Sequence, residues 1–253
     1  MRTSVDVALC TEDPSFEQQA HALCERLGAP LETSLEEAVE RHAIVLHLGA
    51  DGLSLIGNEL TIRGDFTRLA KRMEPGNLSH ELVVRAAKVK GVDQPHVIDA
   101  TAGLGEDSFL LAAAGFTVQL YERDPIIAAM LADALDRAAH DPVLATAASR
   151  MHLVEGDSIA ALQSLTGPPD VVLLDPMFPA KQKSARVKKK LQVLQQLESP
   201  CEDEDALLDA ALAAHPRKVV VKRPLKGPYL AGRKPSYSLS GKAIRYDCIV
   251  VPR

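Results

Sequence analysis

Hydrophobic and polar positions follow two different patterns along the chain. In the first part, residues 5–10 and 43–49 have the short apolar runs of strands, and residues 14–28 have the spacing of an amphipathic helix that ends at a glycine. Residues 51–66 predict a hairpin of short strands with glycine turns. We therefore expect a small N-terminal α/β subdomain over residues 1–78, for which the sequence offers no functional motif.

A helix over residues 78–91, with Ser79 as its N-cap and Gly91 as its stop, is predicted to lead into a second domain over residues 79–253. From Pro95 onward, strand patterns alternate with helix patterns. This alternation predicts an α/β fold with a parallel, doubly wound sheet whose ligands bind outside the carboxyl ends of the strands. We expect strands over residues 96–102, 117–122, 151–157, 170–176, 218–224 and 243–251, the last one antiparallel, and helices over residues 105–115, 124–141 (with Pro125 in the first turn) and 202–216.

Glycines follow the first of these strands. Asp99 is at the predicted strand end, and Gly103 and Gly105 follow it before a helix begins. Glycines let the backbone approach a ligand, and a helix N-terminus offers unpaired N–H groups. The third position of the dinucleotide fingerprint is Ser108 here, and a carboxylate beside the turn would repel a pyrophosphate. It would suit a ligand with a cationic amine and a sulfonium.

Acids also follow the later strands. Glu122 ends the second strand, where an acid grips ribose hydroxyls in this class of sheet. Asp157 ends the third strand, although an aspartate there, taken alone, is more often a helix N-cap than a ligand. Together with Asp99 and Asp175, these acids are predicted to lie along one edge of the sheet and to form an S-adenosylmethionine pocket.

The fourth strand ends in Asp175, Pro176, Met177 and Phe178. This corner resembles the [DN]-P-P-[YF] signature of class I methyltransferases that act on exocyclic amines. We expect Asp175 and a neighbouring carbonyl to accept the two N–H bonds of such an amine, so that its lone pair points at the methyl group. Phe178 would stack on a base turned out of its helix. The alternative is a rigid turn with Phe178 in the core.

The distribution of charge along the chain indicates a binding partner. The chain has 253 residues and a net charge of −5, yet residues 181–253 hold 16 lysines and arginines against 7 acids. A basic segment on an acidic protein favours a polyanion such as RNA, although a solvated helix face would also be basic. The residues expected to contact RNA phosphates are Lys181, Lys183, Arg186, Lys188, Lys189 and Lys190, and the same surface could extend to Lys222, Arg223 and Lys226.

The sequence gives no sign of a metal site, a disulfide framework, a signal peptide or a membrane span. The four cysteines form no CxxC pair, so neither a metal site nor a disulfide framework is predicted. The N-terminal residues lack the apolar region of a signal peptide, and no apolar run is long enough to cross a bilayer. We expect a cytoplasmic protein that binds no metal and no membrane.

From about Arg63 onward, the segments DATAGLGEDSF, YERDP, LLDPMFPAKQKSARVKK and VVVKRP make the chain resemble the RsmJ-type bacterial methyltransferases. That family methylates the exocyclic N2 amine of a guanine in small-subunit (16S) ribosomal RNA. The resemblance implies a class I (Rossmann-like) methyltransferase domain that binds S-adenosylmethionine through Glu106, Asp107, Glu122, Arg123, Asp157, Ser158 and Asp175.

Three other functions stay open at this point. A related enzyme could methylate an adenine or a protein glutamine, although the basic run argues against a protein substrate. An NAD-dependent oxidoreductase could use the same sheet, but no tyrosine and lysine pair for hydride transfer is evident. An RNA-binding protein with an inactive methyltransferase domain is disfavoured by the intact Asp175 and glycines.

Overall fold

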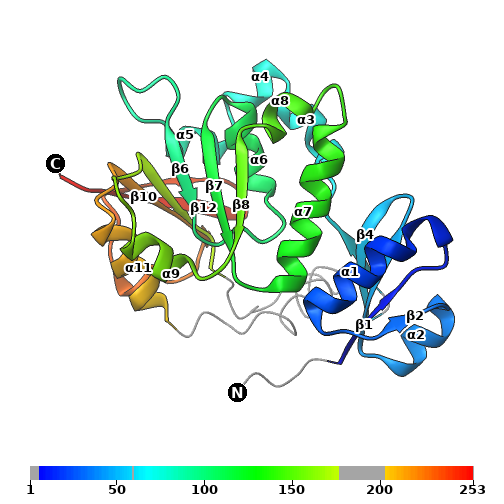
Figure 1. The fold of residues 1–253 in the computed structure, drawn as a ribbon. Helices are drawn as coiled ribbons and strands as arrows, with labels where there is room; N and C mark the ends of the chain where they lie inside the picture. The colour runs from blue at the N-terminus through cyan, green and yellow to red at the C-terminus, as the bar shows by residue number, and fades with distance from the viewer. Residues whose placement is uncertain (1–5, 59, 177–202, 253) are drawn as a thin grey trace.

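The computed structural model describes residues 6–58, 60–176 and 203–252. They form two β-sheets, each packed with helices (Figure 1). The larger sheet has the order β11 (Tyr237–Ser240), β12 (Ile244–Val250), β10 (Lys218–Pro224), β9 (Val171–Leu174), β6 (His96–Asp99), β7 (Thr117–Glu122) and β8 (Met151–Glu155).

Strand pairing confirms the doubly wound sheet. Strands β10, β9, β6, β7 and β8 pair parallel with one another in this order, and β12 pairs antiparallel with β10, as predicted for the last strand. From β6 the chain moves to β7 and β8 on one side and later to β9 and β10 on the other. The topological switch point therefore lies between β6 and β9, where such sheets bind their ligands.

Two hydrophobic layers cover this sheet. On one face, Val97, Val118, Leu173 and Val220 pack against α5 (Leu82–Ala87), α6 (Glu106–Ala113), α7 (Pro125–Ala139) and α8 (Ala145–Ala148). On the other, alternate residues of the same strands pack against α9 (Ser158–Gln163) and α11 (Glu204–Ala213). Burial on both faces explains why β9 is a continuous apolar run.

The smaller sheet has the order β2 (Leu31–Glu32), β1 (Val7–Cys10), β3 (Ile44–Gly49), β4 (Gly52–Gly57) and β5 (Leu60–Arg63). Helices α1 (Glu17–Leu27) and α2 (Leu35–Arg41) accompany it, and α1 ends at Gly28 in the left-handed conformation, as predicted. Its core reaches the larger domain, because Ala129 and Met130 of α7 pack into it.

The connection between the sheets consists of η2 (Phe66–Leu69), α3 (Ala70–Met73) and α4 (Pro75–Leu78). The ring of Phe66 stacks on Phe109 of α6 with 4.1 Å between centroids, and Leu69 lies in the same core. Residues before position 79 thus already contribute to the larger core, and the boundary between residues 78 and 79 stays a prediction.

The predicted helix over residues 78–91 is wrong in its bounds. Ser79 follows the short α4 and its hydroxyl donates to the carbonyl of Gly76, so it does not cap α5. Glu81 occupies the N-cap position of α5 with an extended backbone, and its carboxylate accepts two hydrogen bonds from Arg72, at 2.8 and 2.7 Å. This bidentate pair fixes the break that the pattern of apolar residues did not reveal.

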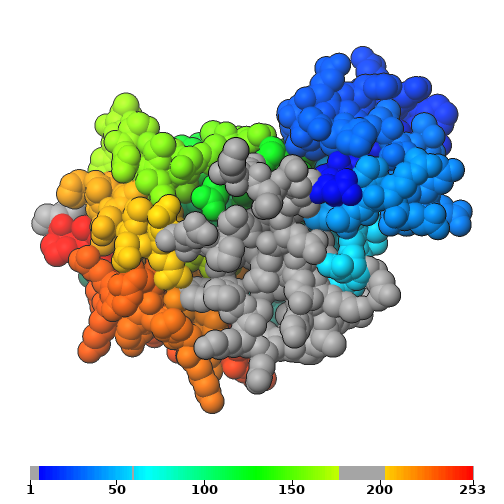
Figure 2. Space-filling view, turned by 90° about the horizontal axis from the view of Figure 1, so that it is seen from below, coloured from blue at the N-terminus to red at the C-terminus, as the bar shows by residue number. Residues whose placement is uncertain are grey.

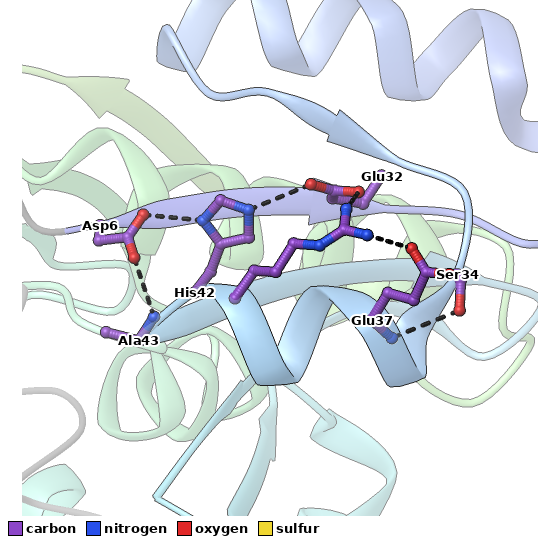
Figure 3. Close-up of polar contacts among 7 residues, drawn as sticks. Asp6, Glu32, Ser34, Glu37, His42 and Ala43 are labelled. Atoms are coloured by element: carbon purple, nitrogen blue, oxygen red, sulfur yellow. Dashed lines mark hydrogen bonds and ion pairs between the residues drawn. The ribbon is translucent and has the colours of Figure 1, made fainter.

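A polar cluster fastens the N-terminal sheet (Figure 3). His42, at the end of α2, lies between Asp6 and Glu32, at 2.8 and 3.2 Å. Hydrogen bonds to the two carboxylates raise the pKa of His42 above its ordinary value. Arg41 pairs with Glu32 and with Glu37. The cluster joins α2 to the residue before β1 and to the last residue of β2.

No helix within residues 6–58, 60–176 and 203–252 combines the length and the hydrophobicity that crossing a membrane requires. Within the same ranges, no group of three or more histidines, cysteines, aspartates or glutamates is arranged to hold a metal ion.

Candidate active site

The end of β6 holds a buried carboxylate. Asp99 accepts a hydrogen bond from the backbone N–H of Thr101 at 3.0 Å and another from the hydroxyl of Ser108. Burial raises the pKa of Asp99 to about 7, and these two hydrogen bonds oppose the rise. The serine that replaces the third fingerprint glycine therefore has a defined role, because it is a hydrogen-bond partner of this acid.

The turn between β6 and α6 requires its glycines. Gly103 and Gly105 have φ angles of +54° and +73°, in the region that favours glycine. A Cβ at Gly105 would lie 2.8 Å from Leu131 of α7, whereas a Cβ at Gly103 would meet no heavy atom within 4 Å. The backbone at Gly103 therefore borders open space that a ligand could enter.

Glu122 connects this turn to the end of β7. Its buried carboxylate accepts hydrogen bonds from the backbone N–H groups of Gly103 and Asp124, both at 2.9 Å. Burial raises the pKa of Glu122. Arg123, next to it, is exposed. The glycine turn and the second strand end are thus held in one fixed arrangement.

Two further predicted contacts lie at the ends of helices. Asp157 is exposed and caps α9, accepting from the backbone N–H of Ile159 at 2.8 Å, and Ser158 begins that helix. The cap that we considered for Asp157 is therefore present, and a cofactor contact stays a prediction. Glu106 and Asp107 form the first turn of α6, with Glu106 exposed.

Asp175 belongs to a network that crosses the switch point. Its carboxylate accepts a hydrogen bond from the ammonium of Lys222, at 2.8 Å, and the same ammonium lies 2.9 Å from Asp107. Asp107 in turn accepts from the hydroxyl of Tyr246, at 2.8 Å. Residues from β10, α6 and β12 therefore support a carboxylate that follows β9.

The backbone of Asp175 is fixed as well. Its N–H donates to the hydroxyl of Thr101 at 2.6 Å, which ties the end of β9 to the turn after β6. The peptide N–H of Asp175 and one of its carboxylate oxygens both form hydrogen bonds, yet the side chain is 42% exposed. The free side of this carboxylate can therefore receive a donor from a substrate.

The protonation states of the network follow from its geometry. Burial alone would lower the pKa of Lys222, but the charges of Asp175 and Asp107 outweigh it and raise this pKa. Burial, and next the charge of Asp107, raise the pKa of the Tyr246 phenol. Lys222 is therefore a permanent cation and Tyr246 a permanent donor at neutral pH.

Two of the residues predicted to contact RNA have protein partners in the structure. The ammonium of Lys222 pairs with the carboxylates of Asp175 and Asp107. Arg223 is buried, where it donates to the carbonyl of Pro228 at 2.9 Å and pairs with Glu204. Alternation of side chains along β10 sends these neighbours to opposite faces of the sheet. Both cations therefore already have protein partners, and the phosphate contacts expected of Lys222 and Arg223 stay predictions.

The remaining predicted contacts, Phe178, Lys181, Lys183, Arg186, Lys188, Lys189 and Lys190, lie outside the described residues. Conversely, sequence reasoning missed Thr101 and Tyr246. A threonine in a glycine turn and a tyrosine in the last strand carry no motif, and the three-dimensional fold brings Tyr246 of β12 to Asp107 of α6.

This sheet, with acids at its switch point, has the architecture of S-adenosylmethionine-dependent methyltransferases. A model of the family described as "Putative SAM-dependent methyltransferase" matches residues 32–251. A solved SAM-dependent methyltransferase from Neisseria gonorrhoeae is similar over 96% of both chains, with 31% identity and a TM-score of 0.74. The class I fold and the S-adenosylmethionine cofactor are therefore confirmed.

Curated relatives define the family more narrowly. The protein named ribosomal RNA small subunit methyltransferase J from Stutzerimonas stutzeri is 43% identical, over 92% of this chain and 91% of its own length. The protein of the same name from Thioalkalivibrio sulfidiphilus is 43% identical over 98% of each chain. This chain belongs to the ribosomal RNA small subunit methyltransferase J family, as its motifs indicated.

Proposed function

We propose that this enzyme transfers a methyl group from S-adenosylmethionine to the exocyclic N2 amine of a guanine in small-subunit (16S) ribosomal RNA. The names of its relatives support an RNA substrate, and such an RNA would place the protein in the cytoplasm. The main support for this chemistry is the Asp175 carboxylate at the switch point, which is partly exposed and pairs with the ammonium of Lys222.

Asp175 suits the role of amine acceptor. The lone pair of an amine conjugated to a base ring is delocalised, so the amine is a weak nucleophile until its N–H bonds are accepted and it is turned out of conjugation. A carboxylate anchored through its peptide N–H and through Lys222 can accept one N–H in a fixed direction, which is positioning catalysis. The nitrogen becomes acidic on methylation, so Asp175 needs no tuned basicity to accept its proton.

The remaining acids and glycines fit the cofactor. Glu122 lies where acids of such sheets bind ribose hydroxyls, and the open space at Gly103 admits the close approach of a ligand. S-adenosylmethionine supplies the electrophilic methyl group when bound, and the acids at the switch point complement its positive charges. The residues we assign to cofactor binding are Asp99, Gly103, Gly105, Glu106, Asp107, Glu122, Arg123, Asp157, Ser158 and Asp175.

Mass spectrometry of 16S ribosomal RNA nucleosides tests the substrate. Cells that lack the gene are expected to lose one N2-methylguanine per 16S molecule, and purified enzyme with S-adenosylmethionine is expected to restore it. Appearance of methyl groups on adenine instead would support a related amine methyltransferase. Unchanged nucleosides in both arms would reject the proposal.

The raised pKa of Asp99 predicts pH-dependent cofactor affinity. Because the pKa is about 7, the carboxylate gains its charge as the pH rises from 6 to 8. A cationic ligand beside it is then favoured, so S-adenosylmethionine affinity should increase roughly fivefold over this interval. Titration calorimetry at several pH values should show a flat profile for Asp99→Asn. Asp209→Asn, on the exposed side of α11, should keep the wild-type slope.

A further inference from the structure

The segment after β10 carries positive charge without any compensating acid. The twenty residues from Pro224 to Ala243 contain four lysines and arginines and no acid. All four side chains are exposed: Lys226, Arg233, Lys234 and Lys242. In a protein of net charge −5, an exposed stretch without any acid provides electrostatic complementarity for a polyanion.

This stretch begins at the catalytic edge of the sheet. Lys226 is four residues beyond Lys222, whose ammonium contacts Asp175. The turn between β11 and β12, which carries Lys242, lies against it, because the N–H of Leu225 donates to the carbonyl of Ala243 at 3.0 Å. Figure 2, which views the molecule from below Figure 1, shows the orange segment on this face.

Two buried arginines hold the backbone of the segment. Arg223 and Arg245 lie directly opposite one another on β10 and β12, where like charges repel. Arg245 donates to the carbonyls of Pro224 and Leu225, both at 2.8 Å, and Arg223 donates to that of Pro228. Desolvating two cations at one loop costs free energy, and these hydrogen bonds to backbone carbonyls offset part of that cost while fixing the conformation of the loop.

Acids and backbone strain support the same conclusion. Glu204 pairs with Arg223 and accepts from the N–H of Ala231, and Asp247 pairs with Arg245. Ala231 has a φ angle of +49°, a conformation that a non-glycine residue adopts only when its surroundings enforce it. The loop is therefore preorganised, which reduces the entropy lost when it binds a partner.

An aromatic ring stands on this rigid loop. The guanidinium of Arg245 lies 5.2 Å from the ring centroid of Tyr229, close enough for a cation–π contact. Tyr229 remains 39% exposed, so part of its ring faces solvent. Exposed cations and a partly open aromatic ring on one ordered segment are the components of a surface for single-stranded nucleic acid.

We propose that residues 224–243 form an RNA-docking platform for the single strand next to the target nucleotide. Lys226, Arg233, Lys234 and Lys242 contact its phosphates, and Tyr229 stacks on one of its bases. This inference rests on the proposed RNA substrate and adds a described surface to the basic run that was recognised in the sequence. The platform places the strand beside Asp175, so it contributes to binding more than to the chemical step.

The test combines RNA binding with steady-state kinetics. Lys226→Ala/Lys242→Ala should raise the Kd for a fluorescently labelled single-stranded RNA, and the KM for 16S RNA, by roughly tenfold, with kcat little changed. The slope of log K against log salt should flatten by about 0.7 for each phosphate that the variant no longer neutralises. Tyr229→Ala should weaken binding roughly fivefold or more, and Tyr229→Phe should keep the wild-type affinity, because the ring alone stacks.

Lys88→Ala/Lys90→Ala is the matched control. It removes the same charge from exposed positions after α5. These positions lie at the amino end of β10, where the ammonium of Lys218 donates to the backbone carbonyl of Lys88, and therefore at the opposite end of this strand from Lys222. It should leave Kd, KM and the salt slope unchanged, and all variants should bind S-adenosylmethionine normally. If both platform variants keep the Kd and the salt slope of the wild type, this inference is overturned. Methylation of 16S RNA by the wild-type enzyme would still support the proposed function in that case. A wild type that never methylates 16S RNA would reject the function itself.

Discussion

Asp175→Asn is expected to reduce kcat for methyl transfer by at least about 10³-fold, within the range that positioned acid–base groups contribute. The amide keeps the size of the carboxylate but loses its charge, so it is a weaker acceptor for the amine and no longer pairs with Lys222. Single-turnover transfer of a labelled methyl group to 16S RNA measures the effect.

Cofactor binding separates this loss from misfolding. The variant should still bind S-adenosylmethionine with reduced but measurable affinity, because Asp99 and Glu122 remain fixed by their own hydrogen bonds. Asp209→Asn on α11 makes the same chemical change at an exposed site and should transfer methyl groups at the wild-type rate. Wild-type turnover in Asp175→Asn would remove the carboxylate from the mechanism.

The sequence predicted the larger domain well because its local and global signals agree. The apolar run of β9 is buried on both faces, and Pro125 begins α7 directly after the Asp124 cap, as the first-turn pattern indicated. Strand ends follow from such patterns, and parallel strands bring their carboxyl ends to one edge. The sequence alone could therefore predict that Asp99, Glu122 and Asp175 lie at one edge of the sheet.

What the sequence did not predict depends on contacts between distant segments. The break before α5 is fixed by the pair of Arg72 and Glu81, which a helical pattern does not reveal. Lys222 read as one more cation of a basic segment, because nothing local distinguishes a lysine that faces Asp175 from one that faces solvent. Positions on β10 alternate between the two faces, so a shift of one residue separates a lysine in the active site from the buried Arg223.

That position of Lys222 leads to the second large effect. Lys222→Met is expected to lower kcat roughly 10²-fold at neutral pH. Asp107 and Asp175 share the ammonium of Lys222, so the substitution removes the counter-ion of both carboxylates. Repulsion between Asp107 and Asp175 then raises the pKa of Asp175, and already in the wild type burial raises this pKa while Lys222 opposes the rise. Lys222 acts through Asp175, and is therefore a positioning residue.

The pH profile distinguishes this role from a purely structural one. Activity requires ionised Asp175, so it is present above the pKa of this carboxyl and lost as the pH falls through it; a higher pKa moves the acidic limb of kcat to higher pH. Lys222→Met should therefore regain part of its activity as the pH rises, and Lys222→Arg, which keeps the charge, should restore the wild-type limb. Tyr246→Phe removes the hydroxyl donor to Asp107 and should shift the limb in the same direction by less, because the ammonium stays in place. An unshifted limb in Lys222→Met, with the thermal unfolding midpoint unchanged, would show that the ammonium does not set the charge of Asp175.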